Sequence, residues 1–582
     1  MVSTGPAGEG PPVLRLAPDP TLDLPRALAR HAAQAPEAIA LRRPGRHSNY
    51  LTTSYRELHD KVRLTATVLR QAGLTVGNRA VVMIRDPEEF LVHLYALMSI
   101  GAVPVLIDPG LPRTGVRTCL DEIAPHAFLA DPLAHLARAL RGWARSSKPV
   151  LVQTGARNRG PWPHIRGLRA AARTTDREGA PPGTAGDGPA LIAFTSGSTG
   201  CPKGVLYTSH QLALQAQYVS TAFGISPGTP AVCAFLPFSL YLPALGAQTL
   251  VPAFDPRRPA DADPKALLDT LTRFRAHSLF GSPALLRVAA QYCADHHIVL
   301  QHLRDVASFG APLSTPLLNL LDTCVPPTTR VRSVYGATEA LPVAMADRTC
   351  LRRSLDNPTS RPPGSLVGTP LPGVEVHILP EDLPPQPRWN PGLAQPPLHI
   401  GEITVGGSHV SRAYFARPQD TASAKIHDGQ RILHRTGDLG WIDTQGQLWY
   451  SGRKAHTVHT PNGPLYTEQI EPSCNTLPGI VRTALVGIGP PGAQRAVLCI
   501  ETTSHTPAAT RAATACVTTH LTGVTGGDLV DHVLVHPGFP VDVRHNAKIE
   551  RPVLAAWAAS RLPVRAQQPH ATAPSPYSGE TP

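Results

Sequence analysis

The stretch FTSGSTGCPKG, at residues 194–204, packs three glycines, four hydroxyls and one lysine directly behind an apolar run. Glycines let the backbone turn tightly and bring its N–H groups against an anion, hydroxyls add donors or reach a metal, and lysine supplies a compact positive charge. The run at 189–194 predicts a short buried strand, so the loop is expected at a strand end, where ligands bind in α/β sheets. The stretch predicts a phosphate-binding loop, with a flexible surface turn as the alternative.

This loop differs from the common G-x-x-x-x-G-K-[ST] phosphate loop, because the chain contains no Gly-Lys dipeptide. Lysine is also rare here: only seven of the 54 basic residues are lysine, and arginine carries most of the positive charge. A lysine inside a loop rich in glycine and hydroxyl groups is therefore expected to have a specific role.

Length and composition narrow the class of protein. A chain of 582 residues is too long for one ordinary core, so two or more domains are expected. Its nine cysteines are scattered without a C-x-x-C pair, which argues against a disulfide framework or a zinc site and favours a cytoplasmic location. The net charge of +12 is spread along the chain without a dense basic run, and aromatic residues make up only 5%, so we expect no nucleic-acid partner.

Residues 90–107 are long and apolar enough to suggest a membrane span. Gly101 and Pro104 interrupt them, however, and predict a helix over 87–100 followed by a strand over 102–107, a buried pair of an α/β core. The N-terminus has no basic region ahead of an apolar one, so no signal peptide is expected. The sequence thus predicts no transmembrane segment.

The chain alternates helical patterns with short apolar strands, for example 114–123 before 127–130, and 264–276 before 278–281. This alternation predicts a largely parallel α/β architecture. The ends, 1–21 and 566–582, are rich in small and polar residues and are predicted to be disordered tails. A shift in composition near 452 predicts a large domain over 22–452 and a smaller one over 453–565.

Two segments after the loop are suited to a nucleotide base. At 308–312 a strand ends in a Gly-Ala-Pro turn before a helix, and backbone of that kind lies flat against a purine, although it is also a common turn. At 333–339 an aromatic side chain is available to stack on a base, and Glu339 is available to hold Mg²⁺.

Three more segments carry isolated charged groups. Asp438, expected on a tight turn within 435–441, is suited to accept hydrogen bonds from ribose hydroxyls, and an ordinary hairpin aspartate is the alternative. Arg453 follows an expected strand at the proposed domain junction. Lys548 lies on a loop of the smaller domain, from which it would reach a cleft; a solvated lysine is the alternative.

Taken in this order, and with the further segment from Gly401-Glu402-Ile403 to Tyr414, these motifs resemble the adenylate-forming superfamily of acyl-CoA synthetases, luciferases and nonribosomal adenylation domains. The resemblance runs from about Leu24 to Leu562. It implies an α/β adenylate-forming fold, with a large N-terminal domain of mixed sheets and helices and a small mobile α+β C-terminal domain. It also implies that ATP is converted to AMP and pyrophosphate.

The resemblance implies a role for each motif. The phosphate loop would hold the β- and γ-phosphates with Lys203 opposing their charge, Glu339 and Thr195 would serve Mg²⁺, Asp438 would bind the ribose, and Arg453 would assist at the phosphate or ribose. Lys548 would bridge the substrate carboxylate and the α-phosphate. The nucleotide-binding residues implied in this way are Thr195, Ser196, Gly197, Ser198, Thr199, Gly200, Lys203, Gly310, Ala311, Pro312, Tyr335, Gly336, Ala337, Thr338, Asp438 and Arg453.

Finer matches at 236–246, 281–286, 452–456 and 543–549 look like the olefin β-lactone synthetases. In those enzymes a long-chain 2-alkyl-3-hydroxy acid is adenylated and its own β-hydroxyl displaces AMP, so no thiol is needed. The resemblance implies this β-hydroxy acid as substrate and, by analogy, neighbouring pathway enzymes as partners.

Other interpretations stay open. A long-chain fatty acyl-CoA ligase or fatty acyl-AMP ligase shares the first half-reaction, although Phe238 and Ser239 stand where many such ligases carry a histidine, and 454–456 lacks the usual acidic hinge residue. An inactive adenylate-binding scaffold is disfavoured because all five separated charged groups are present. The apolar stretch 236–246 is either pocket lining or a core helix. The base for ring closure is not identified, and His456 and His545 lie in suitable segments.

Overall fold

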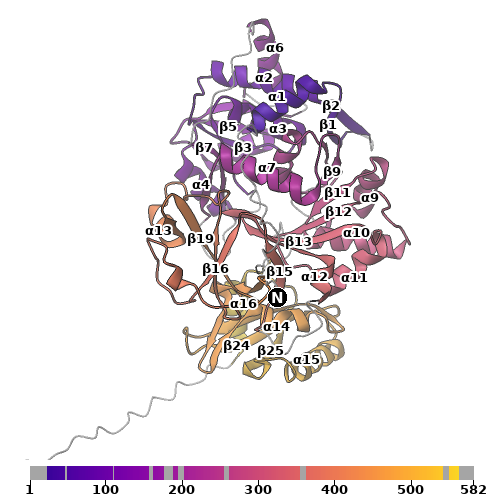
Figure 1. Cartoon of the computed structure of the whole chain (residues 1–582), viewed down its shortest axis with the longest axis vertical. Coiled ribbons are helices and arrows are strands. Elements are labelled where there is room, and N and C mark those ends of the chain that lie inside the picture. The colour runs from indigo at the N-terminus through magenta and orange to yellow at the C-terminus, as the bar shows by residue number, and fades with distance from the viewer. Residues whose placement is uncertain are drawn as a thin grey trace, which may run out of the picture. The chain divides into compact units, whose positions relative to one another are not determined.

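The computed structural model describes residues 23–45, 49–108, 111–155, 162–175, 188–194, 202–254, 261–353, 362–541 and 549–562. The predicted terminal tails, 1–21 and 566–582, lie outside these residues. The described chain forms two compact units (Figure 1). The larger runs to Thr457 and takes in Tyr466–Pro472, and the smaller comprises Val458–Leu465, Ser473–Pro540 and a final helix.

A six-stranded sheet in the large unit flanks the predicted phosphate loop. Its order is β6-β5-β3-β4-β7-β8, parallel throughout except for β8, which runs antiparallel to β7. Short apolar runs form such strands because a parallel sheet is covered on both faces. The strands are β3 (Arg79–Met83), β4 (Val103–Leu106), β5 (Ala127–Ala130), β6 (Val150–Gln153), β7 (Pro189–Phe194) and β8 (Gly204–Thr208).

A fourteen-stranded sheet carries most of the remaining motifs. It is parallel across β10, β9, β11, β12 and β13, and from β13 onward it continues antiparallel through β14, β15, β20, β19, β17 and β16. Its strands are β1 (Ile39–Pro44), β2 (Tyr50–Ser54), β9 (Pro230–Cys233), β10 (Gln248–Leu250), β11 (Ser278–Gly281), β12 (Asp305–Phe309), β13 (Arg330–Ala337), β14 (Ala340–Asp347), β15 (Ser365–Pro370), β16 (Glu375–Leu379), β17 (Gly401–Gly406), β18 (Lys425–Asp428), β19 (Arg431–Ile442) and β20 (Leu448–Arg453).

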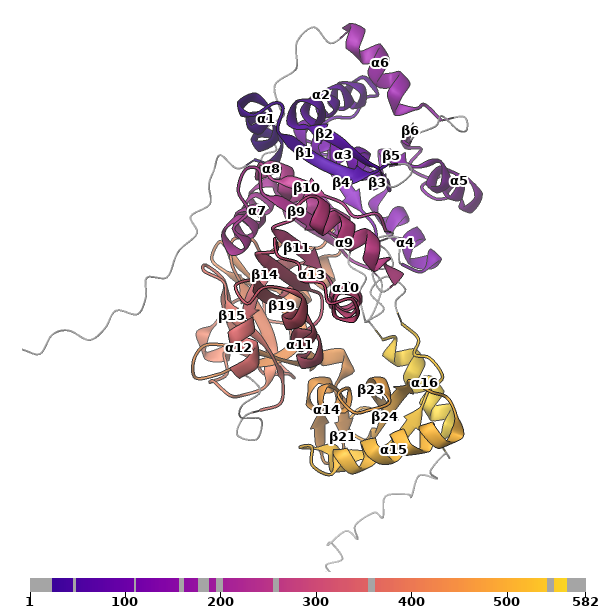
Figure 2. The same cartoon turned by 90° about the vertical axis from the view of Figure 1, so that its right-hand side faces the viewer.

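Several of the helices between these strands begin at capping residues. Ser54 and Thr208 form capping boxes with Glu57 and Gln211, and Asp86 accepts hydrogen bonds from the first turn of its helix. Figures 1 and 2 show α9, α10 and α11 along one face of the parallel strands. The helices of the large unit are α1 (Leu24–Gln34), α2 (Tyr55–Gln71), α3 (Pro87–Ser99), α4 (Arg113–Ile123), α5 (Pro132–Arg141), α6 (Ile165–Thr175), α7 (Ser209–Phe223), α8 (Tyr241–Ala244), α9 (Pro264–Arg273), α10 (Pro283–Asp295), α11 (Thr315–Cys324), α12 (Arg348–Arg353) and α13 (Pro418–Ala424).

The predicted alternation of helices and strands is confirmed, but the expectation of a largely parallel architecture was wrong, because the fourteen-stranded sheet is antiparallel from β13 onward. The apolar stretch 90–107 is divided between α3 and β4, as Gly101 and Pro104 predicted, and Gly101 takes a φ of +72° at the break. In the described part of the chain, no helix combines the length and the apolar character that crossing a bilayer requires.

The small unit is an α+β body. It contains a hairpin of β21 (Val458–Thr460) with β22 (Gly463–Leu465), and a three-stranded sheet in which β24 lies between β23 and β25. These strands are β23 (Ile480–Ile488), β24 (Arg495–Thr502) and β25 (Val530–Val535), and the helices are α15 (Pro507–Leu521) and α16 (Arg551–Arg561). The helix α14 (Thr467–Cys474) joins the two units along the chain.

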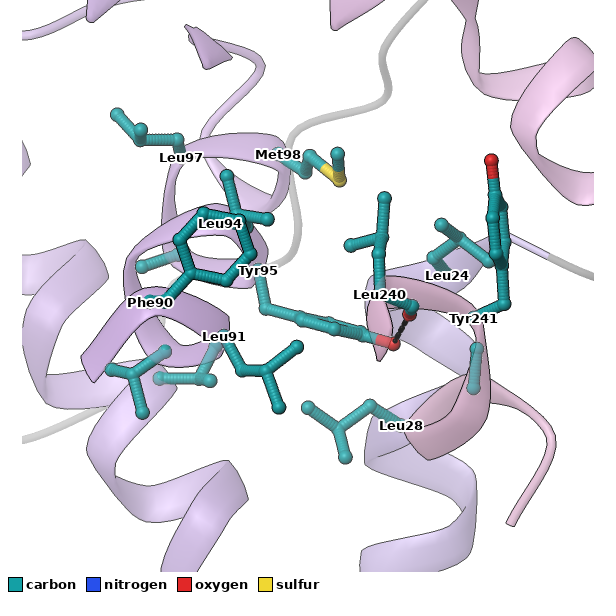
Figure 3. Close-up of a cluster of buried hydrophobic side chains, with 14 of the residues drawn as sticks. Leu24, Leu28, Phe90, Leu91, Leu94, Tyr95, Leu97, Met98, Leu240 and Tyr241 are labelled. Atoms are coloured by element: carbon teal, nitrogen blue, oxygen red, sulfur yellow. Dashed lines mark hydrogen bonds between the residues drawn. The ribbon is translucent and has the colours of Figure 1, made fainter. Parts of the chain in front are cut away.

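The stretch 236–246 forms a 3₁₀ turn, η1 (Leu236–Leu240), that runs directly into α8, and part of it belongs to the core. Figure 3 shows Tyr95 of α3 reaching between Leu28 of α1 and Leu240, with its hydroxyl donating a hydrogen bond of 2.7 Å to the Leu240 carbonyl. Within the same stretch, the ring of Phe238 packs against the rings of Phe280 and Phe309. One face of this stretch is therefore core, and its role as pocket lining stays a prediction.

The buried hydroxyl of Tyr95 gives a stability prediction. Tyr95→Phe removes one fully buried hydrogen bond and is expected to lower the free energy of unfolding by about 1 kcal/mol. Equilibrium urea unfolding measures this change. Tyr292→Phe, at a half-buried tyrosine for which the described part of the chain shows no hydrogen bond from the hydroxyl, is the control and is expected to change little. An unfolding midpoint for Tyr95→Phe equal to that of the control would show that the hydroxyl contributes nothing.

Candidate active site

Lys203 is held beside Tyr414 by strand pairing. The Phe415 N–H donates to the Gly204 carbonyl at 2.7 Å, and Val205 forms a bridge with Tyr414, so the start of β8 lies against residues 413–415. The Lys203 ammonium then lies 5.2 Å from the centre of the Tyr414 ring. It also forms an ion pair of 2.6 Å with Asp420, near the start of α13.

Glu339 lies in the turn between β13 and β14 and contacts the same tyrosine. The Tyr414 hydroxyl donates to Glu339 Oε1 at 2.7 Å, and the Ser411 N–H donates to the Glu339 carbonyl at 2.8 Å. Tyr414 therefore brings together two predicted site residues, Lys203 and Glu339, that are far apart in the sequence. The lysine expected to bind phosphate and the carboxylate expected to bind a metal ion therefore both contact one tyrosine.

Asp438 is buried between two other predicted site residues. The Tyr335 hydroxyl donates to Asp438 Oδ2 at 2.8 Å, and Arg453 Nε lies 2.9 Å from Asp438 Oδ1. Burial raises the pKa of Asp438, while Arg453 and Tyr335 oppose that rise. In turn, the charge of Asp438 raises the pKa of Arg453.

The prediction that Asp438 lies on a tight turn was wrong. Asp438 lies inside β19, directly opposite Arg453 of β20. The glycine before it, Gly437, takes a φ of +71°, and β19 is irregularly paired on both sides here. The glycine thus bends a long strand where the motif suggested a hairpin.

The Gly-Ala-Pro segment forms the predicted turn between β12 and α11. Gly310 takes a φ of +94°, is exposed, and has no atom within 4 Å of the position that a Cβ would occupy. Ala311 and Pro312 are half-buried. This open glycine leaves room for a flat ring to lie against the backbone, which fits a purine.

In contrast to Gly310, the backbone at the end of β13 is closely surrounded by other atoms. A Cβ on Gly336 would come within 3.0 Å of Leu341 and of the Ala340 carbonyl, so only glycine fits there. Ala337 ends the strand, and the Thr338 carbonyl accepts a hydrogen bond from Tyr207. Steric limits thus fix the backbone between Tyr335 and Glu339.

Several predicted site residues lie outside the described residues. They are Thr195, Ser196, Gly197, Ser198, Thr199, Gly200 and Lys548, together with His545. The two ends of the predicted phosphate loop are described: Phe194 ends β7, Gly204 begins β8, and the two residues are paired.

A buried ion pair that the sequence analysis did not assign lies next to Asp438. Arg435 Nε donates to Glu402 Oε2 at 3.0 Å, and its other nitrogens donate to the carbonyls of Leu383 and Pro384. Glu402 Oε1 accepts from the Gly437 N–H at 3.3 Å. This network fixes the bend in β19 that presents Asp438.

Lys425 was also missed. Its side chain is 2% exposed, and its ammonium lies 3.0 Å from Ser411 Oγ and 5.6 Å from the centre of the Tyr414 ring. Burial lowers the pKa of Lys425 to about 7, and the negative charge of Glu339 opposes that shift. The scarcity of lysine drew attention to all seven lysines equally, and no sequence signal distinguished Lys425 from the others.

A family model described as AMP-binding enzyme matches residues 28–415 of the chain. The chain belongs to the AMP-binding enzyme family. The family supports an ATP-dependent, AMP-forming ligase, and the open Gly310, the buried Asp438 and the Lys203–Tyr414–Glu339 cluster fit an ATP site.

Two AMP-binding relatives are similar over nearly their whole length. An olefin β-lactone synthetase of Stenotrophomonas maltophilia (strain K279a) is 42% identical over 92% of this chain and 98% of its own. An olefin β-lactone synthetase of Xanthomonas campestris pv. campestris is 41% identical over 92% of this chain and 97% of its own.

A solved structure shows the same fold. The amide bond synthetase McbA of Marinactinospora thermotolerans matches with a TM-score of 0.74 and 22% identity, over 92% of this chain and 99% of that one. The adenylate-forming fold expected from the motifs is thereby confirmed, with a large sheet-rich part and a smaller C-terminal part.

Proposed function

We propose that this chain is a β-lactone synthetase that uses ATP and Mg²⁺ to adenylate a long-chain 2-alkyl-3-hydroxy acid and then cyclises it. A carboxylate oxygen of the acid attacks the α-phosphorus and pyrophosphate leaves. The β-hydroxyl oxygen then attacks the acyl carbon, AMP leaves, and the hydroxyl proton passes to a base or to the departing phosphate. Similarity to two β-lactone synthetases over 92% of the chain is the observation that carries this proposal.

The proposal assigns a role to each predicted site residue. Lys203 and the loop Thr195–Gly200 bind the β- and γ-phosphates, Glu339 and Thr195 bind Mg²⁺, and 310–312 with Tyr335 enclose the adenine, while Gly336, Ala337 and Thr338 contact the nucleotide. Asp438 accepts hydrogen bonds from the ribose, and Arg453 supports it. Lys548, on the predicted mobile lid over 453–565, neutralises the charge that accumulates between carboxylate and α-phosphate. The domain limits, 22–452 and 453–565, and a cytoplasmic location stay predictions.

No second substrate is needed for ring closure. The nucleophile is part of the adenylate, so correct orientation replaces a binding event and provides a high effective concentration. Expulsion of AMP, a good leaving group, offsets the strain of a four-membered ring. Phe238 and Phe280 are buried in the core, and the half-buried Phe309 that packs against them is the ring of this group proposed to contact an alkyl chain.

An assay without CoA tests the proposal. The enzyme, ATP, Mg²⁺ and a 2-alkyl-3-hydroxy acid are expected to give a product lighter than the acid by one water, detected by mass spectrometry. The matched acid without the 3-hydroxyl is the control and is expected to stop at the acyl-adenylate, because it has no internal nucleophile. Acyl-adenylate alone from the hydroxy acid, turned over only after CoA is added, would contradict lactone formation and identify a ligase.

A further inference from the structure

Lys425 is a buried cation without a carboxylate in direct contact. It begins β18 after α13, and among the described residues no carboxylate forms an ion pair with it. Across the strand pair it faces His434, whose pKa burial lowers well below its usual value, so this neighbour is neutral. Removing an ammonium group from water is costly unless an anion compensates. A hydrophobic side chain would fill this position at lower cost, so packing alone does not account for a lysine here.

Two neighbours of Lys425, Ser411 and Tyr414, each donate a hydrogen bond to Glu339. Ser411, which accepts a hydrogen bond from Lys425, donates its own N–H to the Glu339 carbonyl at 2.8 Å. Tyr414, whose ring lies 5.6 Å from the Lys425 ammonium, donates its hydroxyl to Glu339 Oε1 at 2.7 Å. One side chain thus contacts the residue that holds the backbone of Glu339 and the residue that holds its carboxylate.

The charge of Lys425 strengthens the second of these contacts. An ammonium near an aromatic ring draws electron density toward itself, which makes the phenol a better hydrogen-bond donor to a carboxylate. Lys203 acts on the same ring from 5.2 Å. The two lysines therefore strengthen the hydrogen bond that holds the Glu339 carboxylate in the observed orientation.

We propose that Lys425 is a positioning residue that holds the Glu339 carboxylate ready to bind the divalent cation of the nucleotide. This inference rests on the proposed role of Glu339 as a magnesium ligand. Groups behind a metal ligand typically change metal affinity by 10-fold to 100-fold when they are removed.

The test measures nucleotide binding as well as folding. For Lys425→Met, the Mg²⁺ concentration that supports half-maximal ATP binding in calorimetric titration is expected to rise about 10-fold. The melting temperature without nucleotide is expected to stay the same or rise, because an uncompensated buried charge has been removed. Lys61→Met, at a lysine of α2 paired with Glu88, is the matched control and is expected to leave the Mg²⁺ requirement unchanged.

Two outcomes would overturn the inference. One is an unchanged Mg²⁺ requirement in Lys425→Met, and the other is a raised requirement accompanied by a lower melting temperature, which would mark a structural role. If Lys425→Met does not fold, Lys425→Gln replaces it with the same expectation, because glutamine keeps a donor for Ser411 and loses the charge.

Glu339→Gln separates this inference from the site assignment. If Glu339→Gln leaves the Mg²⁺ requirement unchanged, the assignment of Glu339 fails and the inference falls with it. If Glu339→Gln raises the requirement and Lys425→Met does not, the inference alone fails. Adding Lys425→Met to Glu339→Gln is expected to change little more, because residues that act through one another are not additive, and full additivity would also contradict the inference.

Discussion

Lys548→Ala is expected to slow formation of the acyl-adenylate by about 10²–10³-fold while ATP binding stays nearly unchanged. A carboxylate approaching the α-phosphate brings two negative charges together, and this repulsion peaks in the transition state. In the role proposed for it, Lys548 opposes that charge only at this stage, so its loss is expected to lower kcat far more than it weakens binding. Pyrophosphate release at saturating ATP and acid measures the first effect, and calorimetric titration with ATP measures the second.

The control for this prediction is Lys265→Ala, at an exposed lysine in the first turn of α9. It removes the same charge from the protein and is expected to change neither quantity. Pyrophosphate release by Lys548→Ala at the rate of this control would show that Lys548 has no part in adenylation. A large loss of ATP affinity would instead mean that Lys548 binds the nucleotide in the ground state.

Local patterns in the sequence predicted the elements well. The Gly-Ala-Pro turn after β12, and the division of 90–107 into a helix and a strand, were predicted because a few adjacent residues decide such features. Asp438 was misplaced for the opposite reason. Gly437-Asp438 is a typical turn dipeptide, but pairing with β17 on one side and β20 on the other holds it within a strand.

The residues that the sequence did not reveal depend on pairing between distant strands. Glu402 and Arg435 are 33 positions apart and meet because β17 pairs with β19. Tyr414 and Glu339 are 75 positions apart and meet through contacts of residues 411–415 with β8 and with the turn after β13. The spacing of residues in the sequence does not predict such contacts, because the order of strands in a sheet differs from their order in the chain.

Asp438→Ala is expected to weaken ATP binding by about 10–100-fold, the loss typical of removing hydrogen bonds to a charged acceptor. The carboxylate is buried, and Arg453 and Tyr335 hold it in place, so little water competes with a ribose for its oxygens. Tyr335→Phe keeps the carboxylate and removes one of its supports, so a smaller effect is expected there. Calorimetric titration with ATP compares the two variants.

A change in the ligand shows whether this loss comes from the ribose. The unaltered enzyme is expected to bind ATP more tightly than 2′-deoxy-ATP, because the deoxy sugar leaves a buried carboxylate oxygen without its donor. In Asp438→Ala that preference is expected to disappear, since the group that reads the hydroxyl is gone and the two changes remove the same contact. A variant that binds ATP weakly but still prefers ribose in full would show that Asp438 supports Arg453 or the bend in β19 and does not contact the sugar.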